Sequence, residues 1–226
     1  MSLRAPRAGA DDLADRLEQQ PVSRTDTLLT GAIWTIRSDR VDLGDAGEVT
    51  REWVDHPGAV SILALRQDRG RDEVLLIQQY RHPVGSYEWE LPAGLLDVEG
   101  EPPWQAAARE LAEEADLRAG RWDLLAEYFS SPGGLSEAKR IYLARDLSDV
   151  PAEDRHVREA EEHGMPTRWA DLDEAATAVL TGRMRNSAAH IGILSAVASR
   201  SRGWDTLRPV DLPWPAHPRL RARDGR

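Results

Sequence analysis

Apolar and polar residues alternate over two stretches near the start of the chain, residues 32–37 and 48–54, as they do in strands with one exposed face. The Gly-Asp-Ala-Gly run at residues 44–47 lies between them and is a turn signal. Residues 59–65 are almost continuously apolar, which indicates a strand buried on both faces. Residues 74–80 form the next predicted strand after a polar loop. The pattern therefore predicts a small antiparallel unit, followed by a hairpin at the centre of a mixed sheet.

The second half of the chain mixes strand-like and helical patterns. Residues 103–115 are rich in alanine and carry charges at helical spacing, which predicts a helix. The other predicted elements are strands at residues 122–129, 140–144 and around Trp169, an irregular acidic segment at 146–163, and helices at 171–180 and 187–199. Asp171 is suited to cap the first of these two helices, and the chain enters the second from Asn186.

These elements predict an α/β protein of the α+β kind, organised in four segments. Residues 1–25 are polar and are expected to be a loosely held arm. Residues 26–56 form the N-terminal β unit, and residues 57–202 form the main domain. Residues 203–226 hold four prolines and are expected to be an extended tail.

Composition narrows the classes of function. The net charge of −10 disfavours a dedicated nucleic-acid binder, and an acidic protein that binds phosphates needs cations. The chain has no cysteine, which excludes disulfides, thiol catalysis and zinc sites built on thiolates. No apolar run approaches the roughly 18 residues of a membrane span. Residues 1–24 lack the apolar core of a secretory signal, so we expect a cytoplasmic protein without a membrane partner.

Three carboxylates are clustered on the helix predicted at residues 103–115. Glu110, Glu113 and Glu114 stand at positions i, i+3 and i+4, where like charges repel each other. A divalent cation such as Mg²⁺ removes that repulsion and keeps waters that a phosphate can displace. Arg109 is placed to orient the carboxylates, and Gly94 permits close approach of the backbone. A solvated acidic helix face is the alternative for such a trio taken alone.

The stretch around these glutamates resembles the Nudix box. That box runs from a glycine through a glutamate to Arg-Glu-apolar-any-Glu-Glu-any-Gly-apolar, and Gly94, Glu101 and residues 109–117 match its three parts. Gly94 and Glu101 are separated by six residues, one more than is usual, and the extra residue falls in a loop that tolerates insertion. Asp116 replaces the final glycine; aspartate tolerates the left-handed conformation expected there. The resemblance implies the Nudix α/β/α sandwich around a mixed central sheet.

Further motifs are similar to those of the ADP-ribose pyrophosphatase branch of the Nudix family, and the similarity covers roughly residues 30 to 200. The motifs are Gln-Tyr-Arg at residues 79–81, Glu-Trp-Glu-Leu-Pro-Ala-Gly at 88–94, Ser-Pro-Gly-Gly-Leu-Ser-Glu at 131–137 and Arg-Asn-Ser-Ala-Ala at 185–189. The resemblance implies a metal site, for Mg²⁺ or Mn²⁺, formed by the Ala93 carbonyl, Glu110, Glu113 and Glu114. It implies contacts with a nucleotide substrate from Arg51, Glu52, Arg81, Glu90, Pro132 and Glu137. A polar strand face is an equal alternative for Arg51 and Glu52.

The resemblance implies that bound metal bridges the diphosphate of ADP-ribose and that a carboxylate activates water, which yields AMP and ribose 5-phosphate. The catalytic residues are then Arg109, Glu113 and a glutamate from a loop that holds Glu159, Glu161 and Glu162. Among the three, Glu162 has the spacing to the strand around Trp169 that best suits the catalytic carboxylate. The alternative is that the glutamates of this loop are only a solvated run of charges.

The resemblance also implies a homodimer with exchanged N-terminal strands, and packing of these strands on their own domain is the alternative. Two other functions stay open. One is cleavage of a different nucleoside diphosphate derivative, such as a nucleotide sugar, FAD or 8-oxo-dGDP. The other is a non-catalytic sensor that binds ADP-ribose, which the presence of all three box glutamates disfavours.

Overall fold

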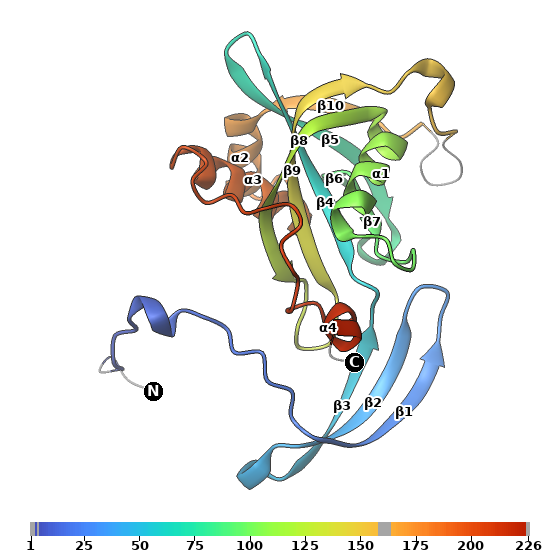
Figure 1. Ribbon diagram of the computed structural model, residues 1–226, viewed down its shortest axis with the longest axis vertical. Coiled ribbons are helices and arrows are strands. Elements are labelled where there is room, and N and C mark those ends of the chain that lie inside the picture. The colour runs from blue at the N-terminus through green and yellow to red at the C-terminus, as the bar shows by residue number, and fades with distance from the viewer. Residues whose placement is uncertain (1–2, 4, 158–163, 225–226) are drawn as a thin grey trace.

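The protein is a mixed α+β structure with two sheets (Figure 1); the computed structural model describes residue 3 and residues 5–157 and 164–224. The strands are β1 (Val22–Thr30), β2 (Thr35–Asp42), β3 (Glu48–Asp55), β4 (Ala59–Asp68), β5 (Arg71–Arg81), β6 (Ser86–Glu90), β7 (Ala93–Leu95), β8 (Leu117–Phe129), β9 (Ala138–Asp149) and β10 (Thr167–Asp171). The helices are α1 (Pro103–Ala115), α2 (Leu172–Leu180), α3 (Ser187–Arg200) and α4 (Pro218–Asp224), with short 3-10 turns η1 (Ala10–Asp12), η2 (Gly44–Ala46), η3 (His82–Val84) and η4 (Ala152–Asp154). No helix among these residues is long and apolar enough to cross a membrane.

Strand β4 is the centre of the seven-stranded sheet, whose order is β10-β5-β4-β9-β8 with β6 beside β5 and β7 beside β4. It pairs antiparallel with β5 and parallel with β9, so the predicted hairpin and the mixed sheet are confirmed. The buried residues of β4 alternate between two cores. Leu63 packs with α2 and α3 on one face, whereas Ile62 packs with α1 on the other. The helices therefore cover both faces, as the α/β/α sandwich requires (Figure 1).

The helix predictions are confirmed with small shifts of their ends. Helix α1 spans the predicted residues, with Pro103 in its first turn, where a missing N–H costs nothing. Asp171 caps α2 by accepting hydrogen bonds from the backbone N–H groups of Asp173 and Glu174. Asn186 caps α3 in the same way through the N–H of Ala189. These caps satisfy backbone donors that have no partner inside the helix.

The β8–β9 hairpin is longer than the sequence predicts. Strand β8 begins at Leu117 instead of residue 122, and β9 covers residues 138–149 instead of 140–144. Residues 146–149 were assigned to an irregular acidic segment, and that assignment is wrong. Their backbone pairs with the start of β8, which stabilises a strand whose side chains are mostly polar and exposed.

The N-terminal unit has three antiparallel strands, β1-β2-β3, instead of the two that the alternating pattern predicts. Strand β1 begins at Val22, inside the segment expected to be an arm, and it is almost wholly exposed, so it lacks a strong apolar signal. Strand β2 begins at Thr35 because residues 31–34 form a turn in which the N–H of Gly31 donates to the Trp34 carbonyl. The predicted turn before β3 is present as η2.

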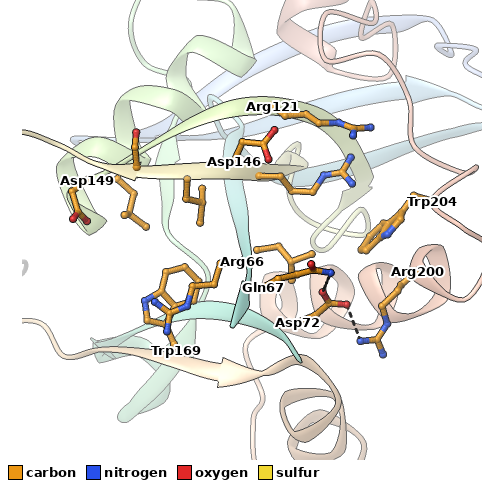
Figure 2. A pocket seen from close by; sticks show the side chains of 14 residues that line it. Arg66, Gln67, Asp72, Arg121, Asp146, Asp149, Trp169, Arg200 and Trp204 are labelled. Carbon is orange, nitrogen blue, oxygen red and sulfur yellow. Dashed lines mark hydrogen bonds and ion pairs between the residues drawn. The ribbon is translucent and has the colours of Figure 1, made fainter. Parts of the chain in front are cut away.

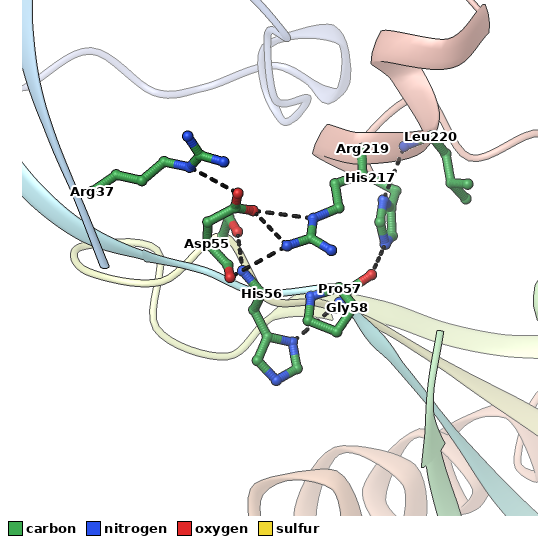
Figure 3. Close-up of polar contacts among 9 residues, drawn as sticks. Arg37, Asp55, His56, Pro57, Gly58, His217, Arg219 and Leu220 are labelled. Carbon is green, nitrogen blue, oxygen red and sulfur yellow. Dashed lines mark hydrogen bonds and ion pairs between the residues drawn. The ribbon is translucent and has the colours of Figure 1, made fainter. Parts of the chain in front are cut away.

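The segment after Gly203 packs against the molecule and ends in α4, whereas the sequence predicts an extended tail. Arg140, whose side chain is 2% exposed, donates to the carbonyls of Leu212 and Pro213 and lies over the Trp214 ring. His217 is also buried, and its ring contacts the Pro57 carbonyl (Figure 3). These polar anchors cannot be seen as a pair in the sequence, because they join residues more than 70 positions apart.

The tail also fixes the junction between the two sheets. Arg219 donates to the Asp55 carboxylate at 2.9 Å, and Arg37 of β2 donates to the same carboxylate at 2.9 Å (Figure 3). The ring of His217 leaves no room for a side chain at Gly58, whose φ is +89°. The four-residue link from Asp55 to Gly58 is therefore held by contacts on both sides.

Candidate active site

Strand β7 and helix α1 bring the first and last parts of the box together. Gly94 pairs with Val60 of β4, and the Glu110 carboxyl group packs directly on the Gly94 Cα. A Cβ atom at Gly94 would lie well within 3.0 Å of the Glu110 side chain, which real contacts do not allow. Glycine at this position is thus required by the approach of a carboxylate.

The carboxylates stand where the helix itself disfavours them. Glu113 and Glu114 are in the last turn of α1, near the negative end of the helix dipole, and that turn has no basic residue. Each misplaced charge costs about 0.3–1 kcal/mol, in addition to the repulsion between neighbours. Such an arrangement weakens the helix, so it indicates a functional use of the charges.

Arg109 offsets part of that repulsion. Its guanidinium donates to both oxygens of Glu101 at 3.1 and 3.0 Å, to Glu110 at 2.6 Å and to Glu113 at 3.3 Å. The hydrogen bond with Glu101 is the largest cause that raises the pKa of Arg109, so the group stays charged. Glu101, a box residue that we had not placed among the site residues, is therefore the anchor that holds Arg109 against the helix glutamates.

Glu114 is the most buried of the three, with 6% of its surface exposed. One of its oxygens accepts a hydrogen bond of 2.8 Å from the backbone N–H of Ala93. This contact fixes the carboxylate beside the residue whose carbonyl the sequence assigns to the metal. A carboxylate has two oxygens with two lone pairs each, so this hydrogen bond does not by itself prevent Glu114 from coordinating a metal.

The donor set suits a hard divalent cation, because it consists of carboxylates and a carbonyl. In the side-chain positions of the described residues, no three acidic or histidine groups stand close enough to hold an ion together. Glu110 and Glu113 turn toward Arg109, and Glu114 turns toward Ala93. Coordination of one ion by all three glutamates thus requires side-chain rotations, which for Glu110 and Glu113 lead away from Arg109.

Asp116 closes the box as the sequence predicts. It follows the last residue of α1 with φ 54° and ψ 34°, in the left-handed region, and its N–H donates back to the Ala112 carbonyl. Its own carbonyl accepts from Val150. The glycine of the family pattern is therefore replaced without loss of the helix end.

A second polar cluster lies on β5 and β6. Arg81 binds Glu90 through two parallel hydrogen bonds of 2.8 Å, and Glu90 is only 3% exposed. Glu88, on the same strand, accepts a hydrogen bond from Asn186 at the start of α3. The sequence placed Arg81 and Glu90 among the substrate contacts, and the structure brings them together with each other. The Glu88–Asn186 contact was missed, since nothing local links residues 98 positions apart.

The loop with Pro132 connects the main domain to the N-terminal unit. Gly134 and Ser136 exchange backbone hydrogen bonds with Val54 of β3, at 2.8 and 3.0 Å. Pro132 is exposed, whereas Glu137 at the end of the loop is half-buried beside Lys139 (3.3 Å). Glu137 also lies 3.8 Å from His56, whose pKa is lowered by burial although Glu137 opposes this.

The remaining predicted substrate residues lie apart from α1, and the candidates for the catalytic base lie outside the described residues. Arg51 and Glu52 are exposed on β3, in the three-stranded sheet, and Arg51 donates to the Thr50 carbonyl. Glu159, Glu161 and Glu162 fall outside the described residues. The structure does describe the residues just before them. Residues 154–157 line a hollow of about 860 Å³ together with Arg109 and Glu113.

Comparison with known proteins agrees with this geometry. The model of the NUDIX domain matches residues 55–191. The ADP-ribose pyrophosphatase of Mycobacterium tuberculosis is 45% identical over 190 residues, which cover 84% of this chain and 88% of that protein. The ADP-ribose pyrophosphatase of Bacillus subtilis is 33% identical over 64% of this chain and 75% of its own length.

A solved structure supports the fold. The crystal structure of an ADP compounds hydrolase superposes with a TM-score of 0.65 at 23% identity, and the match covers 85% of this chain and 99% of that one. The α/β/α arrangement, the glycine approached by Glu110 and the matched domain all point to the same conclusion. The chain belongs to the Nudix hydrolase family.

Proposed function

We propose that the protein hydrolyses the diphosphate of ADP-ribose to AMP and ribose 5-phosphate. The main observation in support is that Glu110 and Glu114 both contact β7, where these box carboxylates lie against the backbone of Gly94 and Ala93. The ADP-ribose pyrophosphatases of M. tuberculosis and B. subtilis, 45% and 33% identical, support the choice of substrate. Other nucleoside diphosphate derivatives share the same diphosphate, so they are the competing substrates to be measured.

Nudix hydrolases need a divalent metal, and we propose Mg²⁺, with Mn²⁺ as the alternative. Glu110, Glu113, Glu114 and the Ala93 carbonyl would hold it. When bound, the metal neutralises the diphosphate and polarises the attacked phosphorus. Arg109 is held by Glu101 and binds Glu110, so it orients the glutamates and limits their repulsion before a metal binds.

A carboxylate must take a proton from the attacking water. Glu162 is the proposed base, with Glu113 as the alternative within the described residues. Residues 154–157 approach Arg109 and Glu113, which supports a contribution of the following segment to this site. The water oxygen bonds to one phosphorus, the bridging oxygen leaves with the other phosphoryl group, and no covalent enzyme intermediate is needed.

Arg51, Glu52, Arg81, Glu90, Pro132 and Glu137 are proposed to surround the two ends of the substrate. Arg51 and Glu52 belong to the N-terminal sheet, so we propose that a second copy of the chain brings them to the site in a homodimer. Leu28, Leu29, Ile33 and Trp34 are exposed on that sheet and its turn, which supports such an interface. A cytoplasmic location stays a prediction from the sequence.

The test is product analysis of the full chain with Mg²⁺ and equal concentrations of ADP-ribose, GDP-mannose, FAD and 8-oxo-dGDP. We expect AMP and ribose 5-phosphate from ADP-ribose at the highest kcat/KM. Glu114→Gln should lower kcat/KM about 100-fold or more, which equals about 2.7 kcal/mol of transition-state stabilisation. Its amide oxygen can still accept the Ala93 hydrogen bond, so the fold is kept.

Glu99→Gln is the matched control, since Glu99 is exposed in the box loop and carries the same charge. It should leave kcat/KM within twofold of the wild type. Faster cleavage of another compound would move the substrate to that compound and keep the Nudix chemistry. Binding of ADP-ribose without cleavage of any compound would refute the enzyme and support a sensor.

A further inference from the structure

A crevice opens where the two parallel strands of the main sheet separate. The register between β4 and β9 ends at Ala64 and Ala144, after which β4 continues beside β5 and β9 continues beside β8. The crevice between the two outer hairpins has a volume of about 720 Å³ (Figure 2). The carboxyl ends of diverging parallel strands are a common place for ligands, and this volume suits a small organic molecule.

The crevice is distinct from the site on α1. Gly94 pairs with Val60 near the start of β4, whereas the crevice begins at Leu65 near its other end. At about 3.3 Å per residue, the distance along the strand from Val60 to Arg66 is about 20 Å. A ligand in the crevice therefore need not compete with a diphosphate bound at the box.

Two arginines share one carboxylate on the β8–β9 side of the crevice. Arg121 and Arg145 are opposite each other in the hairpin, and both approach Asp123, at 3.4 and 2.5 Å. One carboxylate thus serves two guanidinium groups. Arg145 also has a buried Nε atom with no hydrogen-bond partner among the described residues. A buried charged donor without a partner costs at least about 1–3 kcal/mol, so Asp123 does not satisfy the arginine pair completely.

The remaining cations of the crevice are already matched. Arg66 binds Glu73 at 2.7 Å and lies over the Trp169 ring at 4.1 Å, on the wall formed by β4 and β10 (Figure 2). Arg200 binds Asp72 at 3.2 Å and so neutralises the acid on that wall. The arginines that share a single carboxylate are therefore on the side formed by β8 and β9.

Other lining groups complement the uncharged part of a ligand. Asp146 and Asp149 line the crevice on β9, and carboxylates of this kind accept hydrogen bonds from hydroxyl groups (Figure 2). Trp204, near the Arg145 guanidinium at 5.4 Å, offers an aromatic surface. Asp146 itself has φ 55°, a backbone conformation that residues other than glycine seldom adopt and that is frequent at ligand sites.

We propose that this crevice binds a sugar phosphomonoester, with its phosphate at Arg121 and Arg145 and its hydroxyls at Asp146 and Asp149. Two guanidinium groups that face each other across a hairpin match the oxygens of one phosphate. A nucleoside 5′-monophosphate and a free sugar phosphate both carry this chemistry. The proposal rests on the geometry of the crevice and does not depend on which compound the Nudix site cleaves.

The test is isothermal titration of the full chain in EDTA with AMP, ribose 5-phosphate and inorganic phosphate. We expect a saturable Kd for at least one of the two sugar phosphates and weaker binding of inorganic phosphate. Arg121→Glu should raise that Kd about tenfold or more, and added salt should weaken binding in the wild type. Arg121→Gln, a milder change at the same exposed position, should raise the Kd in the same direction.

Arg118→Glu is the matched control. Arg118 lies on the same strand with the same 56% side-chain exposure, and it pairs with Asp154 away from the crevice. Its substitution should leave the Kd unchanged. The proposal is overturned if no sugar phosphate binds, if Arg118→Glu weakens binding as much as Arg121→Glu does, or if Glu114→Gln changes the Kd and Arg121→Glu does not. The last outcome would place the ligand at the box.

Discussion

Substitution of Gly58 by alanine tests the contact between the C-terminal tail and the junction of the two sheets. The residue has φ +89°, and an added Cβ atom would lie within 3.0 Å of the His217 Nε2 atom and 3.1 Å from the Ala138 carbonyl oxygen. The His217 ring must then move, and its contact with the Pro57 carbonyl is lost. The expected result is a folded protein whose tail is held less firmly.

Two costs add in this variant. A side chain in the left-handed region costs about 1–2 kcal/mol, and a buried carbonyl without its partner costs about 1–3 kcal/mol. Their sum is about 2–5 kcal/mol of the free energy of unfolding. For a chain of this length, the middle of that range corresponds to a fall in Tm of about 10 °C.

The assay is urea unfolding followed by tryptophan fluorescence, with Gly70→Ala as the control. Gly70 has φ +77° but nothing within 4 Å of an added Cβ, so that variant measures backbone strain alone. Gly58→Ala should be less stable than Gly70→Ala by the cost of the lost contact. In the double variant Gly58→Ala/His217→Ala the two effects should be less than additive, because removal of the ring removes the clash. Equal stability of Gly58→Ala and Gly70→Ala would refute the steric argument.

Three further predictions concern the same structure. Burial lowers the pKa of His217 from 6.5 to about 4, so as the pH falls His217 is protonated in the unfolded chain before it is protonated in the folded protein. The neutral His217 ring therefore contributes fully to the free energy of unfolding above pH 6.5, and this contribution is lost as the pH falls to 4. Between pH 7.5 and 4.5, the free energy of urea unfolding should fall by up to about 3 kcal/mol more in the wild type than in His217→Gln. Equal falls in the two proteins would contradict this role of His217. Arg140→Lys should cost about 3 kcal/mol and make the tail sensitive to limited proteolysis, because an ammonium cannot reach Glu127, Leu212 and Pro213 together; an unchanged digestion pattern would count against that anchor. Arg109→Lys should lower kcat about 10–100-fold with little change in Tm, since a single ammonium cannot join Glu101 to Glu110; retention of full kcat would remove Arg109 from the site.

The parts of the fold that depend on local pattern were predictable from the sequence. The continuous apolar run of β4, the alanine-rich α1 and the caps at Asp171 and Asn186 are each encoded by neighbouring residues. Strand β1 and the end of β9 were missed because their residues are polar, and only pairing with another strand makes them extended.

The candidate site shows the same division. The spacing of Glu110, Glu113 and Glu114 identifies the carboxylate cluster, and the left-handed Asp116 follows from its place at the helix end. The role of Glu101 as the partner of Arg109 and the contact between Glu88 and Asn186 depend on the folded arrangement. The crevice at Arg121 and Arg145 depends on where two strands separate, which no local pattern records.

The anchoring of Arg140 has a consequence for the order of events during synthesis. Residues 212–217 supply the carbonyl partners of its guanidinium and fill the space beside Gly58, and they are made after every strand of the main sheet. Domains fold progressively from the N-terminus as the chain emerges. Until residues 212–217 have emerged, the nascent sheet therefore lacks the carbonyl partners of Arg140 and the ring that fills the space at Gly58, so the main sheet is completed by a segment that is made after all of its strands.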